Sequence, residues 1–584
     1  MKETITLQLG SYANYVGMHY WNFQEELLDA VDDMEGGEDY EHRRLFRSGR
    51  DPNDRSSLKP RVLVSDLAQN LGHVIFERKG GAAVPAYNNF PSASGAQSQQ
   101  HSEENAHSIW DGGLATMVQD DAPTLHPFQF FLRNSANSAI ASPSQSAESN
   151  ANDYVIKKWT DYQMAPMSQK SMATMPLWYN TDNFDTFLSG RQESSLADYI
   201  EDYLERFRSM SEECDNLSTV QIFADIHDGF SNLTSMILEE IRQEYRGVSI
   251  PVFAFTENGV SFSSDDKSSK IGQLGVPYAY SRICDDSSIM LPISCNSRQK
   301  FSPYIQNTTS EWSTYQTSGV VATAIENIVG SSYINTHSSM SDKSSNQFTN
   351  EIHEMSFNAT NGGRFPLCHL ETCFPFPLFP DSSHDSFMKT FEQLNSTERE
   401  HETKKSFYGM NPFATSLSAA RTGKWRVQPD QEDSRYIPYS NVVAIRGPTN
   451  ADLQKLLFSK CSDSSYLLTS CIQRQTALYI PKSFPHFFSG VNEFGFANNE
   501  LFSTIRSTPT PKADSTDKCV SSSSISAIGT DASMGIHVSN VAETWSKTIE
   551  RGHLQSQLNT SNLDIEECNE ITEKLRSLRN RYEQ

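Results

Sequence analysis

The first 27 residues change their hydrophobic period across a single glycine, and this constrains the fold more than any other feature of the chain. Apolar residues alternate with polar ones in residues 4–9, as in a β-strand, and recur at helical spacing in residues 16–27. Gly10 and Ser11 stand between the two patterns, and we expect the helix to begin near Asn14. Such a turn directs unpaired backbone N–H groups and the positive end of the helix dipole to one point, where α/β folds bind phosphates. The turn is therefore a candidate nucleotide site.

Strand and helix patterns alternate through the first half of the chain. Residues 61–66 predict a buried strand that ends in a carboxylate, Asp66, and residues 196–207 predict an amphipathic helix. Residues 219–255 then read as strand, loop, helix and strand, a unit of about 37 residues. Parallel strands joined by helices form doubly wound sheets, so the fold class is predicted as α/β with a parallel sheet.

The second half predicts a buried helix, a second α/β domain and C-terminal helices. Residues 317–329 are apolar almost all round, as in a helix buried between domains, and residues 442–446 predict a strand. A last helix places Ile571, Leu575 and Tyr582 on one face. We expect domains or segments at 1–260, 261–330 (a connection with the central helix), 331–504, 505–530 (a disordered linker) and 531–584 (helical).

Serine-rich polar stretches interrupt these patterns. They have too little apolar surface to offset the entropy of the chain, so we expect loops or insertions, for example at Ser521–Ser524. The four stretches are about 91–106, 134–152, 331–348 and 505–525.

Charge and cysteine content exclude several classes of function. With 48 Lys and Arg against 72 Asp and Glu, the net charge of −24 opposes binding to nucleic acid or anionic lipid and favours basic protein partners. The nine scattered cysteines indicate a reducing compartment, and Cys368 and Cys373 are expected to be buried thiols, not half of a zinc site. No window reaches the roughly 18 apolar residues of a membrane helix, so any membrane association is expected to be peripheral.

Two strings carry a resemblance to known proteins. The N-terminal string, with Gln8, Gly10, Asn14 and Gly17, resembles the first strand, phosphate loop and helix of tubulins. The string Asp-Ile-His-Asp-Gly-Phe-Ser at 225–231 is similar to the matching loop of the Misato family, tubulin-related proteins named for mitochondrial distribution and morphology. The resemblance implies a tubulin/FtsZ-like fold, with a Rossmann-type nucleotide-binding domain, a second α/β domain and C-terminal helices.

The loop at 225–231 lies where tubulins have a glycine-rich phosphate loop, and it retains one glycine, Gly229. Glycines let the backbone approach phosphates without a Cβ in the way. The Asp228 carboxylate adds a repulsion of roughly 4 kcal/mol at about 4 Å from a phosphate for an effective dielectric constant near 20. Phosphate binding is therefore impaired in this loop.

Three interpretations of the loop remain open. In the first, its polar side chains satisfy one another and cap the following helix. In the second, GTP or GDP binds weakly without turnover, and in the third, three carboxylates gather Mg²⁺. The residues are Asp225, His227, Asp228 and Ser231 for the turn; Gly10, Ser11, Asn14, Gly229 and Ser231 for the nucleotide; Asp66, Asp225 and Asp228 for the metal. The vestigial nucleotide site that we predict contains Gly10, Ser11, Asn14, Asp66, Asp228, Gly229 and Ser231.

The resemblance implies a function without turnover. It places Ala68 where tubulins carry an acid, and no counterpart of the loop that triggers hydrolysis follows the central helix, so we assign no catalytic residue and no metal ligand. We expect a non-enzymatic regulator of mitochondrial distribution, morphology and inheritance. It would be cytoplasmic, with peripheral association at the mitochondrial outer membrane. The expected partners are proteins at that surface, with tubulin or a chaperonin as further candidates and a link to the spindle. The alternative is a slow GTPase or a GTP-gated assembly protein of the tubulin superfamily.

Overall fold

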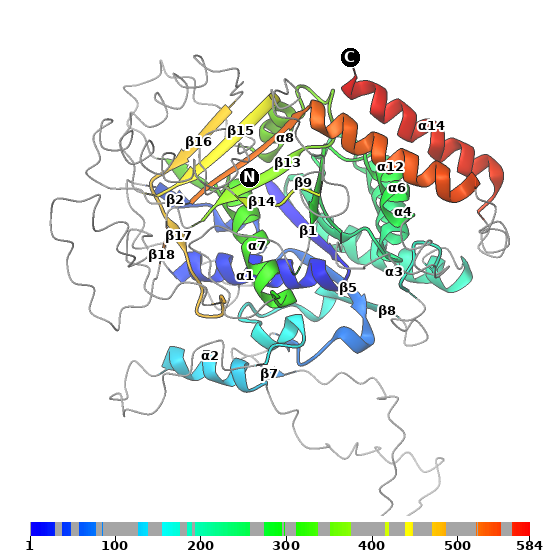
Figure 1. Ribbon diagram of the computed structural model, residues 1–584. Coiled ribbons are helices and arrows are strands. Elements are labelled where there is room, and N and C mark those ends of the chain that lie inside the picture. The colour runs from blue at the N-terminus through cyan, green and yellow to red at the C-terminus, as the bar shows by residue number, and fades with distance from the viewer. Residues whose placement is uncertain are drawn as a thin grey trace, which may run out of the picture.

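Two β-sheets, the helix between them and the helices around them form the core of the computed structural model (Figure 1). The structure describes residues 2–29, 38–47, 58–76, 84–85, 126–137, 155–175, 184–189, 193–256, 274–294, 297, 311–336, 351–374, 415–419, 438–447, 470–485, 521–522, 524–550 and 563–583. Most of the predicted polar insertions, and residues 375–380 and 486–489, lie outside these ranges.

The first sheet has six strands, all parallel, in the order β11-β10-β9-β1-β5-β8. The chain builds outward from β1 through β5 to β8 and then returns to the other side of β1 with β9. The crevice between β1 and β9 is therefore the topological switch point, where α/β sheets bind ligands. The strands are β1 (Glu3–Leu9), β5 (Val62–Leu67), β8 (Met172–Met175), β9 (Leu217–Asp225), β10 (Pro251–Thr256) and β11 (Ile289–Ser294).

Helices cover both faces of this sheet, because its strands are apolar on both sides. Ile5, Leu7 and Leu9 share one hydrophobic cluster with α3, α4, α6, α12 and α14, whereas Val64 and Phe223 face α1 and α7. The predicted α/β class with a parallel sheet is thereby confirmed. The helices are α1 (Ser11–Asp29), α3 (Glu193–Glu212), α4 (Phe230–Glu244), α6 (Gly275–Ile283), α7 (Thr314–Gly330), α12 (Ala532–Glu550) and α14 (Ile565–Tyr582).

Helix α7 is the predicted central helix and lies between the two sheets. Nearly every residue from Thr317 to Gly330 is buried, which explains why this stretch is apolar all round. The second sheet is mixed, in the order β14-β13-β19-β15-β16. Its strands are β13 (His369–Cys373), β14 (Thr415–Ser416), β15 (Pro438–Arg446), β16 (Ser470–Arg474) and β19 (Ser524–Asp531), and α8 (Ile352–Ala359) packs beside it.

The structure corrects one expectation from the serine-rich composition. Residues 524–530, which we placed in a disordered linker, belong to β19, the middle strand of the second sheet. Ser521 and Ser522 form a short ladder with Leu478 and Tyr479. Strand β19 pairs antiparallel with both β13 and β15, so hydrogen bonds on both edges stabilise a segment whose own apolar surface is small. Composition alone could not reveal these partners.

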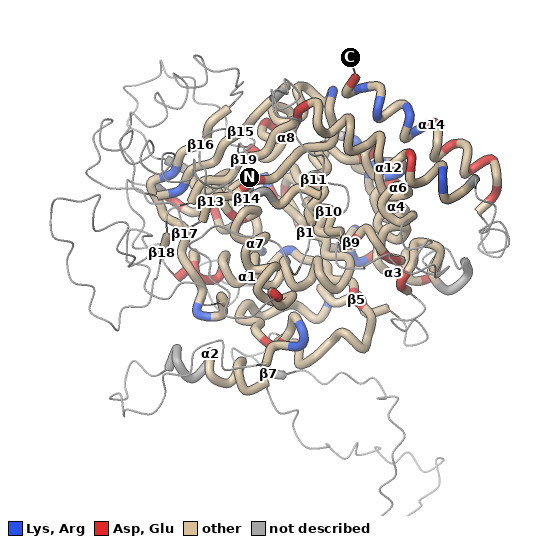
Figure 2. The backbone as a smooth tube through the Cα atoms, in the orientation of Figure 1, with Lys and Arg blue, Asp and Glu red and all other residues tan. Residues whose placement is uncertain are grey.

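Short ladders and the C-terminal helices complete the described part of the chain. On α14, acidic residues occupy the first half and basic residues the second half, which suits the helix dipole (Figure 2). Ile571, Leu575 and Tyr582 are buried, as the predicted apolar face requires. No described helix is long and apolar enough to cross a membrane. The ladders are β2 (Glu38–Tyr40) with β12 (Ile334–Thr336), β3 (Phe46–Arg47) with β4 (Lys59–Pro60), β6 (Ile75–Phe76) with β7 (Val84–Pro85), and β17 (Leu478–Tyr479) with β18 (Ser521–Ser522).

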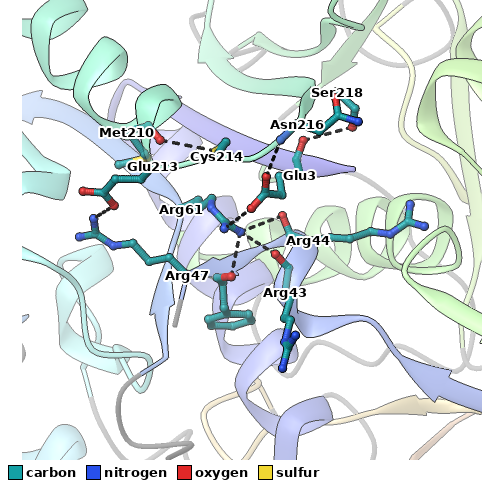
Figure 3. A network of polar contacts seen from close by, with 11 residues as sticks. Glu3, Arg43, Arg44, Arg47, Arg61, Met210, Glu213, Cys214, Asn216 and Ser218 are labelled. Carbon is teal, nitrogen blue, oxygen red and sulfur yellow. Dashed lines mark hydrogen bonds and ion pairs between the residues drawn. The ribbon is translucent and has the colours of Figure 1, made fainter. Parts of the chain in front are cut away.

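A buried ion pair fixes the amino end of the first sheet (Figure 3). The Arg61 guanidinium lies 2.5 Å from a Glu3 carboxylate oxygen and donates to the backbone carbonyls of Arg43 and Phe46 at 2.6 and 2.8 Å. The other Glu3 oxygen accepts the N–H of Asn216 at 2.9 Å. Because both guanidinium Nη atoms of Arg61 and both Glu3 oxygens take part in hydrogen bonds, much of the desolvation cost of the pair is offset and β1 is held in register between β5 and β9.

Candidate nucleotide site

The carboxyl ends of β1 and β9 meet the first turn of α1, and the last residue of β9 occupies that turn. The Asp225 carboxylate accepts the N–H groups of Tyr12 and Ala13, both at 2.9 Å. These are two of the amides that a helix N-terminus leaves unpaired and that bind phosphate in many α/β folds. In this chain they are satisfied by an internal carboxylate. The capping also explains why α1 begins at Ser11, three residues before the predicted start near Asn14.

Gly10 makes this close approach possible. Its φ of +115° lies in the region that favours glycine, and its N–H donates to the carbonyl of Ser65 at 3.2 Å. A Cβ built on Gly10 would lie 2.4 Å from Asp225 Oδ2, so no side chain fits between the turn and the carboxylate. The glycine that the sequence assigned to phosphate binding therefore accommodates Asp225.

Asn14 and Asp66 form a second buried polar group beside the first. Asn14 Nδ2 donates to Asp66 Oδ2 and to the carbonyl of Ser65, both at 3.0 Å. Trp159 Nε1 donates to the same carboxylate at 2.9 Å, as does Asn70 Nδ2. Burial raises the pKa of Asp66 to about 6, although these donors oppose the shift. Groups of the protein itself thus donate four hydrogen bonds to the two oxygens of the Asp66 carboxylate.

The loop after β9 is closed by its own hydrogen bonds and by an aromatic ring. Asp228 Oδ1 accepts the N–H of Phe230 at 2.9 Å, and the Asp228 carbonyl accepts the Ser231 hydroxyl at 2.7 Å. Gly229 donates its N–H to the carbonyl of Phe184 at 3.0 Å, and a Cβ on Gly229 would meet the Phe184 ring at 2.7 Å. The ring thus covers the one glycine through which the backbone could approach a phosphate.

These contacts agree with the capping interpretation of the loop, with one difference. Asp228 precedes α4 and accepts hydrogen bonds from Phe230 and Ser231 in the first turn of that helix, but Asp225 caps α1 instead. Burial raises the pKa of the Asp225 carboxyl well above its usual range, with a smaller contribution from the neighbouring Asp228 charge.

The three carboxylates of the magnesium interpretation accept hydrogen bonds from different donors, and the described residues contain no group of three or more His, Cys, Asp or Glu able to hold a metal ion. That interpretation therefore has no geometric support.

Comparisons with known proteins assign this architecture to a family. Residues 2–134 match the model of the Misato Segment II tubulin-like domain, and residues 149–334 match that of a tubulin domain. Together the two matches cover more than half of the 584 residues. This chain belongs to the Misato family. Both the resemblance inferred from the sequence and the tubulin-like fold are thereby confirmed.

Individual Misato relatives are distant and are matched over part of their length. The chain is 25% identical to Protein DML1 of Gibberella zeae over 56% of this chain and 59% of the relative. It is 27% identical to Protein misato homolog 1 of Mus musculus over 42% of each chain, and 25% identical to Protein misato of Drosophila melanogaster over 55% of this chain and 58% of the relative. The chain thus spans about half the length of the curated relatives that it matches.

Sequence reasoning named Gly10, Asn14, Asp66 and Gly229 as candidates for a site in this Misato-family chain, but it did not name Phe184 and Trp159, which contact Gly229 and Asp66. Phe184 lies in an irregular segment, 45 residues before Gly229, and no local pattern connects the two. Trp159 is also remote in sequence from Asp66. The sequence does contain a signal for the role of Asp225, because a carboxylate at the end of a strand next to β1 can reach the N-terminus of α1. This signal can be recognised only when the order of the strands in the sheet is known.

Proposed function

We propose that this chain is a non-enzymatic, tubulin-like regulator of mitochondrial distribution, morphology and inheritance that acts by binding other proteins. The observation that carries the proposal is the pair of hydrogen bonds from the Tyr12 and Ala13 amides to Asp225, at 2.9 Å each. A phosphate could use these amides only after the Asp225 carboxyl group had left them, because both groups would occupy one place. The chain would therefore act without GTP or GDP.

The cellular part of the proposal rests on membership of the Misato family. Relatives named misato occur in fly and mouse, and the resemblance of the sequence to that family implies a role in mitochondrial distribution and morphology. We infer that the chain works in the cytoplasm and associates peripherally with the mitochondrial outer membrane through protein partners, with tubulin or a chaperonin as further candidates. A link to microtubule and spindle organisation belongs to the same inference.

Titration of the purified chain with labelled GTP and GDP tests the biochemical part of the proposal. Without and with Mg²⁺, we expect no saturable binding below about several hundred micromolar, since the first-turn amides are already satisfied. We also expect no release of phosphate above the rate without protein. The rival function, a slow GTPase or GTP-gated assembly protein, requires micromolar binding with phosphate release, and that result would replace our proposal.

Re-expression in depleted cells tests the cellular part. In cells that have lost this chain, we expect mitochondria to cluster and to be unequally inherited, and the wild-type chain to restore their distribution. An empty vector serves as the control, and mitochondrial spread is measured by fluorescence microscopy. Normal mitochondria in the depleted cells would contradict the proposed role.

A further inference from the structure

We propose that a groove on the first domain, distinct from the candidate nucleotide site, binds a peptide segment of a partner protein. This segment is acidic and also carries apolar side chains. The groove has a volume of about 590 Å³ and lies between α2 (Pro127–Asn137) and the loops that follow β5 and precede β8. We call it the basic groove. The lining residues that carry the inference are His73, His126, Val155, Lys157, Lys158 and Asp161.

The charge of the basic groove runs against that of the whole chain. The chain carries a net charge of −24, whereas two lysines line this groove with a single acid, Asp161, and with two histidines, of which His126 has its Nε2 3.9 Å from Asp161 Oδ2. Asp161 Oδ2 accepts the backbone N–H groups of Lys157 and Lys158, both at 2.9 Å, so this carboxylate is engaged by the loop itself. Lys157 is exposed and lines the groove. It is therefore available to an acidic ligand.

Hydrogen bonds hold the walls of the groove in place. Tyr15 on α1 donates its hydroxyl to the carbonyl of Lys157 at 2.5 Å, and Lys158 Nζ donates to the carbonyl of Leu71 at 2.5 Å. Gln129 on α2 donates to the carbonyls of Thr160 and His73 at 2.6 and 3.1 Å. Because three separate segments are tied together, the cationic groups are presented on an ordered frame, which reduces the entropy lost on binding.

One exposed apolar side chain in the groove wall and another on α2 favour a peptide over other anions as the ligand. Val155 lines the groove with 70% of its surface exposed, and Phe130 is 59% exposed. Phe130 lies three residues after Pro127, another lining residue, and therefore on the same side of α2. Phosphate groups and nucleic-acid backbones offer no partner to aliphatic side chains, whereas an acidic segment with leucine or phenylalanine matches both kinds of surface.

The inference rests on the proposed function in one respect, that the chain acts by binding proteins.

Fluorescence polarisation with the full chain and a labelled dodecapeptide of glutamates interspersed with leucine and phenylalanine tests the inference. We expect binding in the range of about 10–100 µM at low salt that weakens at least about fivefold in 0.3 M NaCl. A peptide with lysine in place of every glutamate, and a single-stranded RNA of about the same length, should not bind.

Two variants locate the binding. Lys157→Glu is expected to weaken the peptide at least about tenfold, and Val155→Asp at least about fivefold, because like charges then oppose the ligand. Lys547→Glu makes the same charge change on an exposed residue of α12 and should leave binding within about twofold of wild type. Thermal melting checks that all three variants fold.

Three results would overturn the inference: no binding of the acidic peptide to the wild-type chain, equal binding to Lys157→Glu and Lys547→Glu, or binding of the RNA instead of the peptide. Neither GTP nor GDP is present in this experiment. Its failure would therefore leave the result of the GTP and GDP titration unaffected, so the two proposals fail separately.

Discussion

Asp225→Ala is expected to lower the free energy of unfolding by about 3 kcal/mol. The substitution removes both hydrogen bonds to the first turn of α1 and leaves the half-buried N–H of Tyr12 and the buried N–H of Ala13 without this acceptor. Hydrogen bonds to charged groups contribute about 1.5–3 kcal/mol each, and the loss of a helix cap costs about 1 kcal/mol. The expected loss is near ~3 kcal/mol, because removing the Asp225 carboxylate also relieves some repulsion with the Asp228 charge. Urea unfolding followed by circular dichroism measures the loss.

The same variant should acquire an anion site that the wild-type chain lacks. With the carboxylate gone, the α1 amides are free to bind phosphate, and about 50 mM phosphate should return about 1 kcal/mol of the lost stability to Asp225→Ala at constant ionic strength. The wild-type chain should gain much less. Asp202→Ala on α3 removes an exposed carboxylate and serves as the control, with a change below about 0.5 kcal/mol. Equal effects of phosphate on wild type and Asp225→Ala would contradict the assignment.

Arg446→Met is expected to destabilise the chain by about 3–5 kcal/mol, because it leaves the buried Glu326 without its partner. Arg446 Nη1 lies 2.8 Å from Glu326 Oε1, and both side chains are 1% exposed. Gln24 on α1 donates to the other Glu326 oxygen, so this group joins α1, α7 and β15 at the centre of the molecule. Burial raises the pKa of Glu326, and the Arg446 charge opposes that shift. Urea unfolding at pH 7 measures the effect.

An exposed ion pair provides the matched control for this prediction. Lys547→Met breaks the pair with Glu543 on α12, where both side chains are about 60% exposed, and should change stability by less than about 0.5 kcal/mol. Combining Arg446→Met with Glu326→Gln should recover part of the loss, since no unpaired charge then remains buried. If Arg446→Met were no more harmful than Lys547→Met, Glu326 and Arg446 would not be coupled in the way that their contacts indicate.

Elements with a clear local period could be predicted from the sequence. The alternation in β1 and the helical spacing in α1 identify both elements, and the unit from β9 through α4 to β10 gives the parallel sheet. In each pattern the spacing of the apolar residues shows which face of a short segment is buried. This spacing can be read from neighbouring residues alone, so it predicts the type of element without knowledge of distant partners.

Features that depend on distant partners could not be predicted in this way. Strand β19 has the composition of a linker and becomes the middle of a sheet because β13 and β15, far away in the sequence, pair with it. The same limit applies at the candidate site. Asp225 lies more than 200 residues from the amides that it caps, and Phe184 reaches Gly229 from an irregular segment. Residue types indicated a degenerate cradle, but only the strand order shows what fills it.

In this Misato-family chain, side chains of the protein itself fill the candidate nucleotide site of a tubulin-like fold. The amides at the N-terminus of α1, of the kind that bind phosphate in many α/β folds, donate here to the Asp225 carboxylate. The fold retains the buried central helix and the second sheet, while the surfaces available to partners include a groove whose charge is opposite to that of the chain.

The occupation of the α1 amides by Asp225 is tested most directly by a crystal structure of the wild-type chain grown with GDP and Mg²⁺ at about 5 mM, well above ordinary nucleotide dissociation constants. We predict that the Asp225 carboxylate will accept the Tyr12 and Ala13 N–H groups and that no phosphate will lie at this turn. A GDP phosphate bound to these amides, with Asp225 displaced, would contradict the central claim.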